Sequence, residues 1–217
     1  MNLEITPEKA EILGLLCAEG NHRGYYDMYF EKDRRRKAVF LRERWKEIIE
    51  FSNTDMPLLE HFVKLLSIAY DYEPKITKSN KNVFRVCITK KNIIRDLLRY
   101  VKLGCLKWDV PECVLESNDK IKLAFIRGFF DGDGSVDFTR STPRIRFSSS
   151  NRNGLESLCL LLDSFGLEYS LNGPYARRLP SFELLLKTKS VKKFIKLVGS
   201  RHSNKSIKFQ RIIAEGV

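Results

Sequence analysis

The sequence predicts an α+β protein made of two αββαββα repeats that are related by a pseudo-twofold axis. Two observations predict this fold class. A helical segment rich in small residues occurs twice in the 217 residues. Each copy is followed by strand-like and helix-like segments in the same order. Because an internal repeat marks a repeated structural unit, the two halves are expected to share one fold.

The repeated segment reads AEILGLLCAEG at 10–20 and AFIRGFFDGDG at 124–134, an offset of 114 residues. Small residues recur at every fourth position in both copies, and most other positions are large and apolar. This spacing places the small residues on one stripe of a helix, where they let two helix backbones approach closely. The two helices are therefore expected to pack through Ala10, Gly14, Ala18, Ala124, Gly128 and Gly132.

Both helices carry end signals. Thr6 before Pro7 suits an N-cap followed by proline at the first helical position, and Ser117 or Asn118 can cap the second copy. Gly20 and Gly134 follow the last helical residues, where a left-handed residue often ends a helix. We therefore expect both glycines to adopt that conformation.

The first repeat continues with a hairpin, predicted from alternation and aromatic content over 24–32 and 37–53. Residues 42–47 could instead form a loop or local turn. A helix at 58–70, strands at 74–77 and 83–89, and a helix at 92–103 are expected to follow.

The second repeat shows the same order after its first helix. Strands are expected at 135–140 and 143–150, a helix at 154–165, strands at 168–175 and 181–187, and a helix at 190–198, followed by a basic tail. The boundary between the repeats falls within WDVPECVLESN at 108–118. This divides the chain into an N-terminal repeat, 1–113, and a C-terminal repeat, 114–217.

An acidic residue occupies the last turn of each repeated helix, Glu19 in one and Asp133 in the other. A carboxylate there opposes the helix dipole, and two such carboxylates repel each other if the helices pack. A divalent cation would explain the arrangement, and oxygen ligands favour Mg²⁺. Incidental acids at the ends of two core helices are the simpler alternative. Asp131 aligns with Cys17, so it lacks an acidic counterpart and is expected to be structural.

The composition indicates which class of partner the chain binds and in which compartment it acts. Lys and Arg number 39 against 27 acidic residues, which gives a formal charge of +12. A chain this basic usually binds a polyanion, because its positive electrostatic field attracts phosphates. Five cysteines without a C-x-x-C pair favour reduced thiols in the cytoplasm over a disulfide framework or a zinc site. The opening MNLEITPEKA does not read as a secretion signal, and no apolar run approaches the ~20 residues that span a bilayer.

ILGLLCAEG at 12–20 and IRGFFDGDG at 126–134 resemble the two motifs of LAGLIDADG homing endonucleases, and the resemblance covers nearly the whole chain. The second motif is very specific, whereas the first departs at Cys17 and Glu19. The resemblance implies an intron-encoded, metal-dependent endonuclease that acts as a monomer. Two copies in one chain imply cleavage of both strands of a long asymmetric duplex, with a saddle-shaped antiparallel sheet from each half in the major groove.

Carried over residue by residue, the resemblance assigns Glu19 and Asp133 as catalytic metal ligands, with Ala18 and Gly132 beside them in the metal site. The cofactor is expected to be Mg²⁺, with Mn²⁺ able to substitute. Family members often place a basic residue at the end of the fourth strand of a repeat. This points to Lys187, and to Lys90 next to the aligned Thr89. A solvated strand end or a phosphate contact is the alternative for each lysine.

Arginine suits bidentate contacts to guanine, and lysine suits contacts to phosphate. Basic and aromatic residues on the expected strands and hairpin tips are therefore candidate DNA contacts. They are Tyr25, Tyr29, Arg34, Arg35, Arg36, Lys75, Lys78, Lys81, Arg140, Arg144, Arg146, Arg177 and Arg178. No membrane and no obligate protein partner are expected, and the nucleoid is the expected place of action. A catalytically silent protein of the same fold, either an intron maturase or a DNA-binding regulator, remains the alternative.

Overall fold

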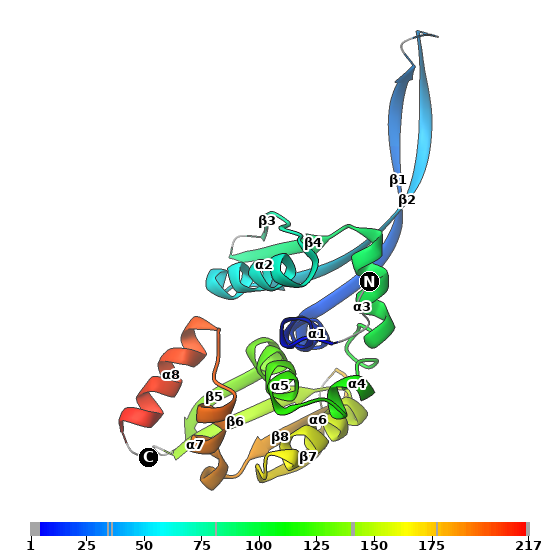
Figure 1. The fold of residues 1–217 in the computed structure, drawn as a ribbon. Helices are drawn as coiled ribbons and strands as arrows, with labels where there is room; N and C mark the ends of the chain where they lie inside the picture. The colour runs from blue at the N-terminus through cyan, green and yellow to red at the C-terminus, as the bar shows by residue number, and fades with distance from the viewer. Residues whose placement is uncertain are drawn as a thin grey trace.

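The computed structural model describes residues 5–33, 35, 37–80, 82–139, 142–176 and 178–215. It contains two four-stranded antiparallel sheets and confirms the α+β fold with two repeats (Figure 1). The first repeat comprises α1 (Pro7–Glu19), β1 (Gly20–Asp33), β2 (Ala38–Asn53), α2 (Met56–Tyr70), β3 (Ile76–Asn80), β4 (Val83–Ile88) and α3 (Lys91–Tyr100). The second comprises α5 (Asp119–Asp133), β5 (Gly134–Thr139), β6 (Thr142–Ser149), α6 (Arg152–Ser164), β7 (Tyr169–Tyr175), β8 (Ser181–Leu186) and α7 (Thr188–Leu197).

Two further helices lie outside the repeated order. The short α4 (Glu112–Leu115) belongs to the connection between the repeats. The expected basic tail is instead a helix, α8 (Ser203–Ala214), whose apolar residues Phe209 and Ile212 are buried. The tail prediction was wrong because basic side chains dominate the segment and hide an amphipathic helix.

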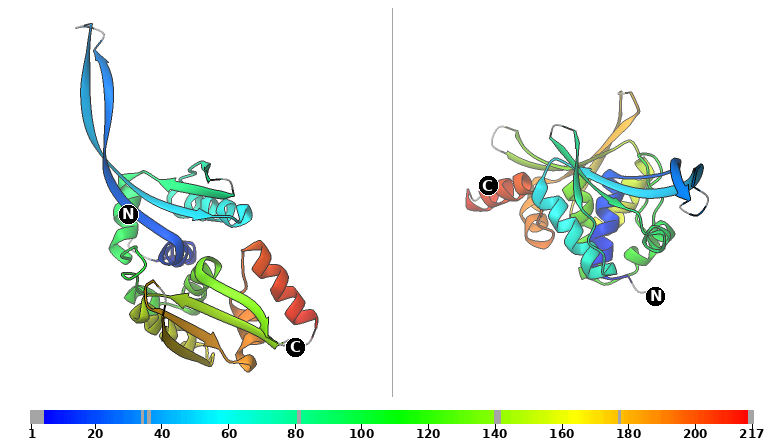
Figure 2. Two further views of the ribbon diagram at one scale, coloured as in Figure 1. Left: turned by 180° about the vertical axis from the view of Figure 1, so that it is seen from behind. Right: turned by 90° about the horizontal axis from the view of Figure 1, so that it is seen from above.

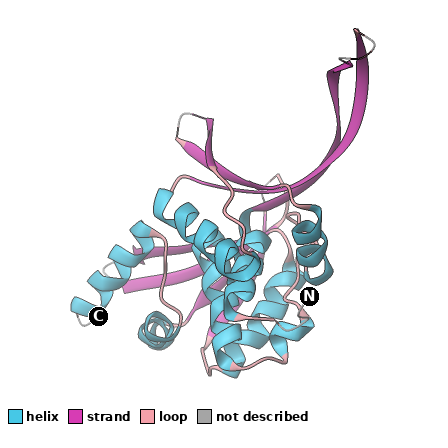
Figure 3. Ribbon diagram, turned by 45° about the horizontal axis from the view of Figure 1, so that its top comes forward, coloured by secondary structure: helices cyan, strands magenta, loops and turns pink. Residues whose placement is uncertain are grey.

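The sheets have equivalent strand orders, β1-β2-β4-β3 and β5-β6-β8-β7. Their registers also correspond, since Gly20 pairs with Phe51 in one sheet and Gly134 with Phe147 in the other. In both repeats the central helix runs directly into the first strand, so its last residue stands at the edge of a sheet. Figure 3 shows the strands forming curved surfaces with helices packed behind them.

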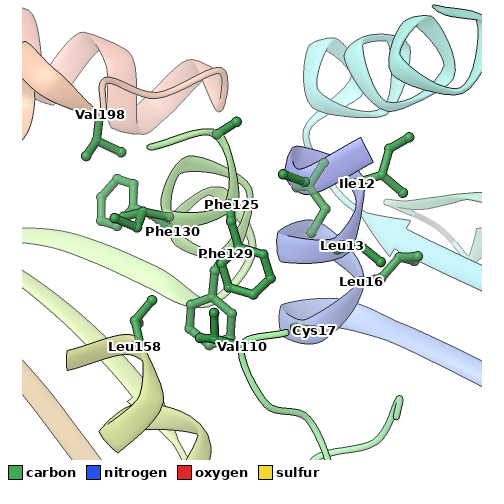
Figure 4. Close-up of a cluster of buried hydrophobic side chains, with 14 of the residues drawn as sticks. Ile12, Leu13, Leu16, Cys17, Val110, Phe125, Phe129, Phe130, Leu158 and Val198 are labelled. Carbon is green, nitrogen blue, oxygen red and sulfur yellow. The ribbon is translucent and has the colours of Figure 1, made fainter. Parts of the chain in front are cut away.

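Helices α1 and α5 lie side by side between the sheets (Figures 1 and 4). An added Cβ at Gly14 would lie 2.3 Å from the carbonyl oxygen of Phe125, and one at Gly128 would lie 2.2 Å from that of Glu11. At this approach a methyl group already collides with the opposite backbone. The helices therefore meet at the stripe of small residues, and large side chains such as Phe129 and Leu13 fill the core on either side.

The helix starts agree with the sequence. Thr6 Oγ1 accepts a hydrogen bond from the Lys9 amide at 3.3 Å, and Asn118 Oδ1 accepts one from the Ile121 amide at 3.3 Å. The helix ends differ from the prediction, because Gly20 and Gly134 are extended, with φ of −76° and −74°. Left-handed geometry would turn the chain away, whereas here it continues straight into a strand. Glycine is needed because a Cβ would lie about 2.4–2.5 Å from the carbonyl of Leu16 or Phe130.

The hairpin of β1 and β2 projects far beyond the rest of the molecule (Figures 1 and 2). Its strands have 14 and 16 residues, against 6 and 8 for β5 and β6. Strand β2 is continuous through 42–47, so the open alternative of a loop there is not adopted. We call the part of this hairpin at 24–47 the arm.

A buried ion cluster ties the two repeats together. Glu11 of α1 accepts two hydrogen bonds from Arg127 of α5, at 2.6 and 3.1 Å, and lies 2.8 Å from His61 Nε2 of α2. Burial alone would raise the pKa of Glu11, but the hydrogen bonds from His61 and Arg127 outweigh burial and lower it to about 2. Glu11 is therefore a charged link between the halves at neutral pH.

Candidate functional site

The two acids at the ends of α1 and α5 lie close to each other. A Cβ added to Gly132 would lie 2.4 Å from the Cβ of Ala18 and 3.4 Å from the Cγ of Glu19. Glu19 and Asp133 are both partly buried, and each is the last residue of its helix. The close approach of the helices thus brings two carboxylates from different repeats to one place, at the start of β1 and β5.

The electrostatics of the pair show that negative charge is costly there. Burial raises the pKa of Glu19, while a hydrogen bond from Asn53 and the charge of Lys205 oppose the shift. Burial, and then the charge of Glu19, raise the pKa of Asp133 to about 7, with Lys205 again opposing. A bound cation would relieve both causes of the shift at Asp133, since it replaces lost solvation and screens Glu19.

A turn at the end of β2 orients Glu19. Asn53 Nδ2 donates to Glu19 Oε2 at 2.6 Å, and Asn53 Oδ1 accepts from the backbone amide of Asp55 at 2.8 Å. The second repeat has the same turn, in which Ser149 Oγ accepts from the Asn151 amide at 3.1 Å. Ser149 Oγ accepts a hydrogen bond from the Trp108 indole at 3.3 Å. In the second repeat this position therefore contacts the connection between the repeats, whereas Asn53 contacts the acid.

Lys205 of α8 is a site residue that the sequence did not reveal. Its ammonium donates to the carbonyl oxygens of Phe130, Asp131 and Gly132 at 2.7, 2.8 and 3.2 Å. Burial lowers the pKa of Lys205 to about 8, although Asp131, Glu19 and Asp133 all act to raise it. The apolar spacing of Phe209 and Ile212 was the available signal, because it indicates a helix that could return to the body.

Asp131 has the structural role that its lack of an acidic counterpart predicts. Its side chain is 1% exposed, accepts a hydrogen bond from the Ser200 hydroxyl, and accepts another from the Arg201 amide at 2.8 Å. Asp131 therefore fixes the segment that leads into α8.

Lys90 and Lys187 precede α3 and α7 as N-cap residues, and both are exposed. The ammonium of Lys90 lies over the Tyr72 ring, 4.7 Å from its centroid. Within the described residues, neither lysine forms a hydrogen bond or ion pair with Glu19 or Asp133, whereas the charge of Lys205 acts on both acids. An active-site role for Lys90 and Lys187 stays a prediction.

The oxygen set fits a small divalent cation that keeps part of its water shell. Across the described ranges, no three His, Cys, Asp or Glu side chains gather as a metal cage. Two carboxylates and the neighbouring backbone carbonyls of Ala18 and Gly132 are what the helix ends offer. Mg²⁺ is bound in this manner in many proteins, by one or two carboxylates together with substrate phosphates and water.

The candidate DNA contacts that the structure describes are spread over exposed strands and turns. Tyr25 and Tyr29 lie on β1, where they are 41% and 43% exposed. Arg35, Lys75, Lys78, Arg144 and Arg178 are also exposed. Arg34, Arg36, Lys81, Arg140 and Arg177 lie outside the described residues. Contact of any of these residues with DNA stays a prediction.

Arg146 differs from the other candidates because it already has acidic partners. It forms an ion pair with Asp137 and lies 3.6 Å from Glu183. The first repeat has the opposite balance, since Glu50 receives both Arg23 and Arg85 at 3.1 and 3.2 Å. One cluster therefore joins two arginines to one acid, and the other joins one arginine to two acids.

Two family models match the chain, one in each repeat. Residues 120–199 match a LAGLIDADG-like domain, and residues 40–105 match the WhiA LAGLIDADG-like domain. A DNA polymerase of Methanocaldococcus jannaschii is 25% identical over 166 residues, which are 75% of this chain and 9% of that protein. A probable cell division protein WhiA of Clostridium acetobutylicum is 28% identical over 177 residues, 75% of this chain and 54% of that protein. The chain thus spans about half or less of these relatives.

Solved structures show the same fold over nearly the full length. The homing endonuclease I-DmoI, in complex with DNA and Mn, superposes with a TM-score of 0.65 at 17% identity, covering 91% of this chain and 98% of that one. I-SmaMI, bound to uncleaved DNA with calcium ions, superposes with a TM-score of 0.57 at 13% identity, covering 98% and 93%. In the part of the chain that is described, no helix is long and apolar enough to cross a membrane.

Proposed function

We propose that the chain, whose two repeats match LAGLIDADG-like domain models, is an endonuclease that breaks both strands of a long asymmetric DNA site. The observation that carries the proposal is the meeting of Glu19 and Asp133 at the ends of α1 and α5. Two scissile phosphates on opposite strands are related by a local twofold axis. Two acids from equivalent positions of two repeats match that requirement.

We infer that the cofactor is Mg²⁺ and that Mn²⁺ can replace it. A bound cation would polarise the attacking water and stabilise the leaving oxygen. Glu19 and Asp133, with the carbonyls of Ala18 and Gly132, would hold it. Asn53 keeps the Glu19 carboxylate in one orientation through the 2.6 Å hydrogen bond. Neighbours of the same fold were solved with Mn and with Ca, which supports the use of a divalent cation.

The DNA partner is supported by the charge of +12 and by the basic and aromatic residues on the exposed strands. We infer a monomer, because one chain supplies both repeats and both acids. We also infer an intron-encoded enzyme that acts on nucleoid DNA. The five cysteines are all free, which agrees with a reducing compartment such as the cytoplasm.

The test is a selection for cleaved plasmids, followed by a cleavage assay of the selected site with wild type and variants. The chain is incubated with Mg²⁺ and a plasmid library carrying randomised inserts, and the linearised molecules are sequenced at their ends. We expect one enriched site, cut on both strands and protected by chelation of the metal. Asp133→Asn and Glu19→Gln are the matched controls, because each keeps the size of the side chain and removes its charge. Equal cutting by either variant would contradict the proposal.

A second function has its own support. The match of residues 40–105 to the WhiA LAGLIDADG-like domain favours a binding protein of this fold that does not cut. The selection separates the two, since a regulator would enrich one DNA site by filter binding and leave it intact with Mg²⁺ or Mn²⁺. Tight binding of an intron RNA without DNA cleavage would instead indicate a maturase.

A further inference from the structure

We propose that Lys205 is a positioning residue of the metal site, which acts by holding the last turn of α5 from the neighbouring helix α8. It would thereby fix the carbonyl of Gly132 and the carboxylate of Asp133 where they meet the divalent cation. The inference rests on the proposed function, because the cation is that of the proposed nuclease.

The end of α5 needs an external donor. The last carbonyls of a helix have no partner within the helix, and a left-handed glycine cap would normally supply amides to them. Gly134 is extended, so that cap is absent, and the last turn of α5 contains no basic residue. Lys205 donates to the carbonyls of Phe130, Asp131 and Gly132, one from each of its three N–H groups. The Phe130 carbonyl also accepts from the Gly134 amide, so the carbonyls of Asp131 and Gly132 depend most on Lys205.

Lys205 is itself held from both repeats. At the start of α8, the Ser203 amide donates to Asp55 Oδ2 of the first repeat at 3.0 Å. Three residues earlier the Ser200 hydroxyl donates to Asp131 of the second repeat. Further along, the ring of Phe209 stacks on Phe130 with centroids 5.5 Å apart. The ammonium therefore reaches α5 from a base that is fixed on both sides, as a positioning group requires.

Helix α8 lies outside the repeated order, because the first repeat ends with α3 and the chain then passes through the short α4 to α5. Lys205 therefore belongs to the Asp133 side of the site, and repetition of the fold does not require it.

The ammonium acts through α5 because its donors are directed at backbone oxygens. Groups that orient metal ligands in this manner change metal affinity or activity by roughly 10–100-fold when they are removed. We therefore expect Lys205→Met to raise the Mn²⁺ concentration at half-saturation by roughly 10–100-fold. Lys208→Met is the matched control, because Lys208 lies on the same helix and donates to the carbonyl of Val136 at 2.8 Å, on β5.

The experiment is a Mn²⁺ titration of the whole chain, followed by the electron paramagnetic resonance signal of free Mn²⁺, with thermal melting of every variant. A weakened Lys205→Met beside a wild-type-like Lys208→Met supports the assignment. Equal titration curves for Lys205→Met and Lys208→Met overturn it. Tighter binding by Lys205→Met also overturns it, because the lysine would then only compete with the cation.

A second variant covers a failure of Lys205→Met to fold. Lys205→Gln keeps two N–H donors on a shorter side chain that cannot reach three carbonyls, so it is also expected to weaken Mn²⁺ binding. A folded Lys205→Gln with wild-type affinity would contradict the assignment. If the wild type binds Mn²⁺ but cuts no DNA, the nuclease proposal fails and Lys205 is still judged by the titration. If the wild type binds no Mn²⁺, both fail.

Discussion

The two repeats have the same fold but surround their acids differently. Glu19 receives a hydrogen bond from the Asn53 amide of its own repeat. Asp133 lies beside a helix end that Lys205 holds, and burial and the charges of Glu19 and Lys205 shift its pKa. The strand order is the same in both repeats, whereas the charges around the two acids differ. The two strands of a bound duplex would therefore contact unequal sites, so one strand should be cut before the other.

The repeats also differ in reach. Strand β1 has 14 residues and β5 has 6, and at about 3.3 Å per residue these strands span roughly 46 and 20 Å. The arm therefore extends only the first half of the concave surface. A target recognised by both halves should be contacted over a longer stretch on the side of the first repeat.

The largest expected effect concerns cleavage, and it tests whether Glu19 and Asp133 are both required. Asp133→Asn should lower the cleavage rate at least ~1,000-fold, about 4 kcal/mol in the barrier, because it removes a charge that holds the cation. Its affinity for the duplex should stay within about tenfold, since contacts to DNA are spread over both sheets. Strand-specific gels and filter binding measure the two quantities. Nicks that accumulate in one strand with Asp133→Asn and in the other strand with Glu19→Gln would show that each acid serves mainly one strand.

The next effect concerns the ion cluster that joins the repeats. Glu11→Gln leaves Arg127 without its buried partner and should lower the free energy of unfolding by about 3 kcal/mol at pH 7. The pKa of Glu11 is about 2, below its ordinary value of 4.5. The stabilisation is therefore complete above pH 4.5 and lost as the pH falls towards 2. Urea unfolding at several pH values measures this, and a gap between wild type and variant that persists at pH 2 would contradict it.

Substitutions of Gly14 and Gly128 test the contact between α1 and α5, where the two repeats are alike. Gly14→Ala and Gly128→Ala should each destabilise the fold by about 2 kcal/mol, because each Cβ would meet the opposite helix backbone at 2.2–2.3 Å. Lys120→Ala, on an exposed part of α5, is the control and should change little. Thermal melting that left either glycine variant unchanged would show that the helices separate more easily than the geometry indicates.

The sequence predicted what repetition and periodicity determine. The offset between the two helical segments gave the pseudo-twofold pair, and the acids at 19 and 133 followed from the same alignment. Lys205 could not be found in that way, because α8 lies outside the repeated order and the first repeat offers no position to align with it. The role of Asn53 could not be found by alignment either, because its counterpart in the second repeat is Ser149. The left-handed glycines were wrong because the rule for helix ends describes chains that turn away, whereas Gly20 continues into a strand.

A smaller effect comes from the pKa of Asp133, which burial and the charge of Glu19 raise to about 7. The cation requires the ionised form, so affinity should rise with pH until the group is fully ionised. Mn²⁺ binding at pH 6 should be about tenfold weaker than at pH 8, and Asp133→Asn should lose this dependence. The raised pKa also means that the metal-free fold loses stability as the pH rises from about 4 to 7. Divalent cation should restore that stability at pH 8 in the wild type alone, as measured by thermal melting.

The smallest expected effect tests the unequal arginine clusters on the strands. Arg144 is exposed, whereas Arg146 is paired with Asp137 and Glu183. Arg144→Gln removes one phosphate-binding cation and should lower the slope of log K against log salt by about 1, with a loss of a few-fold in affinity at physiological salt. Arg146→Gln removes the same charge and also leaves two carboxylates without their arginine, so like charges then face the DNA. Its loss should exceed that of Arg144→Gln at low salt, and the two should converge as salt screens the carboxylates. Fluorescence anisotropy over a salt series measures both variants. Equal losses at every salt concentration would mean that the acids of the second repeat do not oppose the duplex.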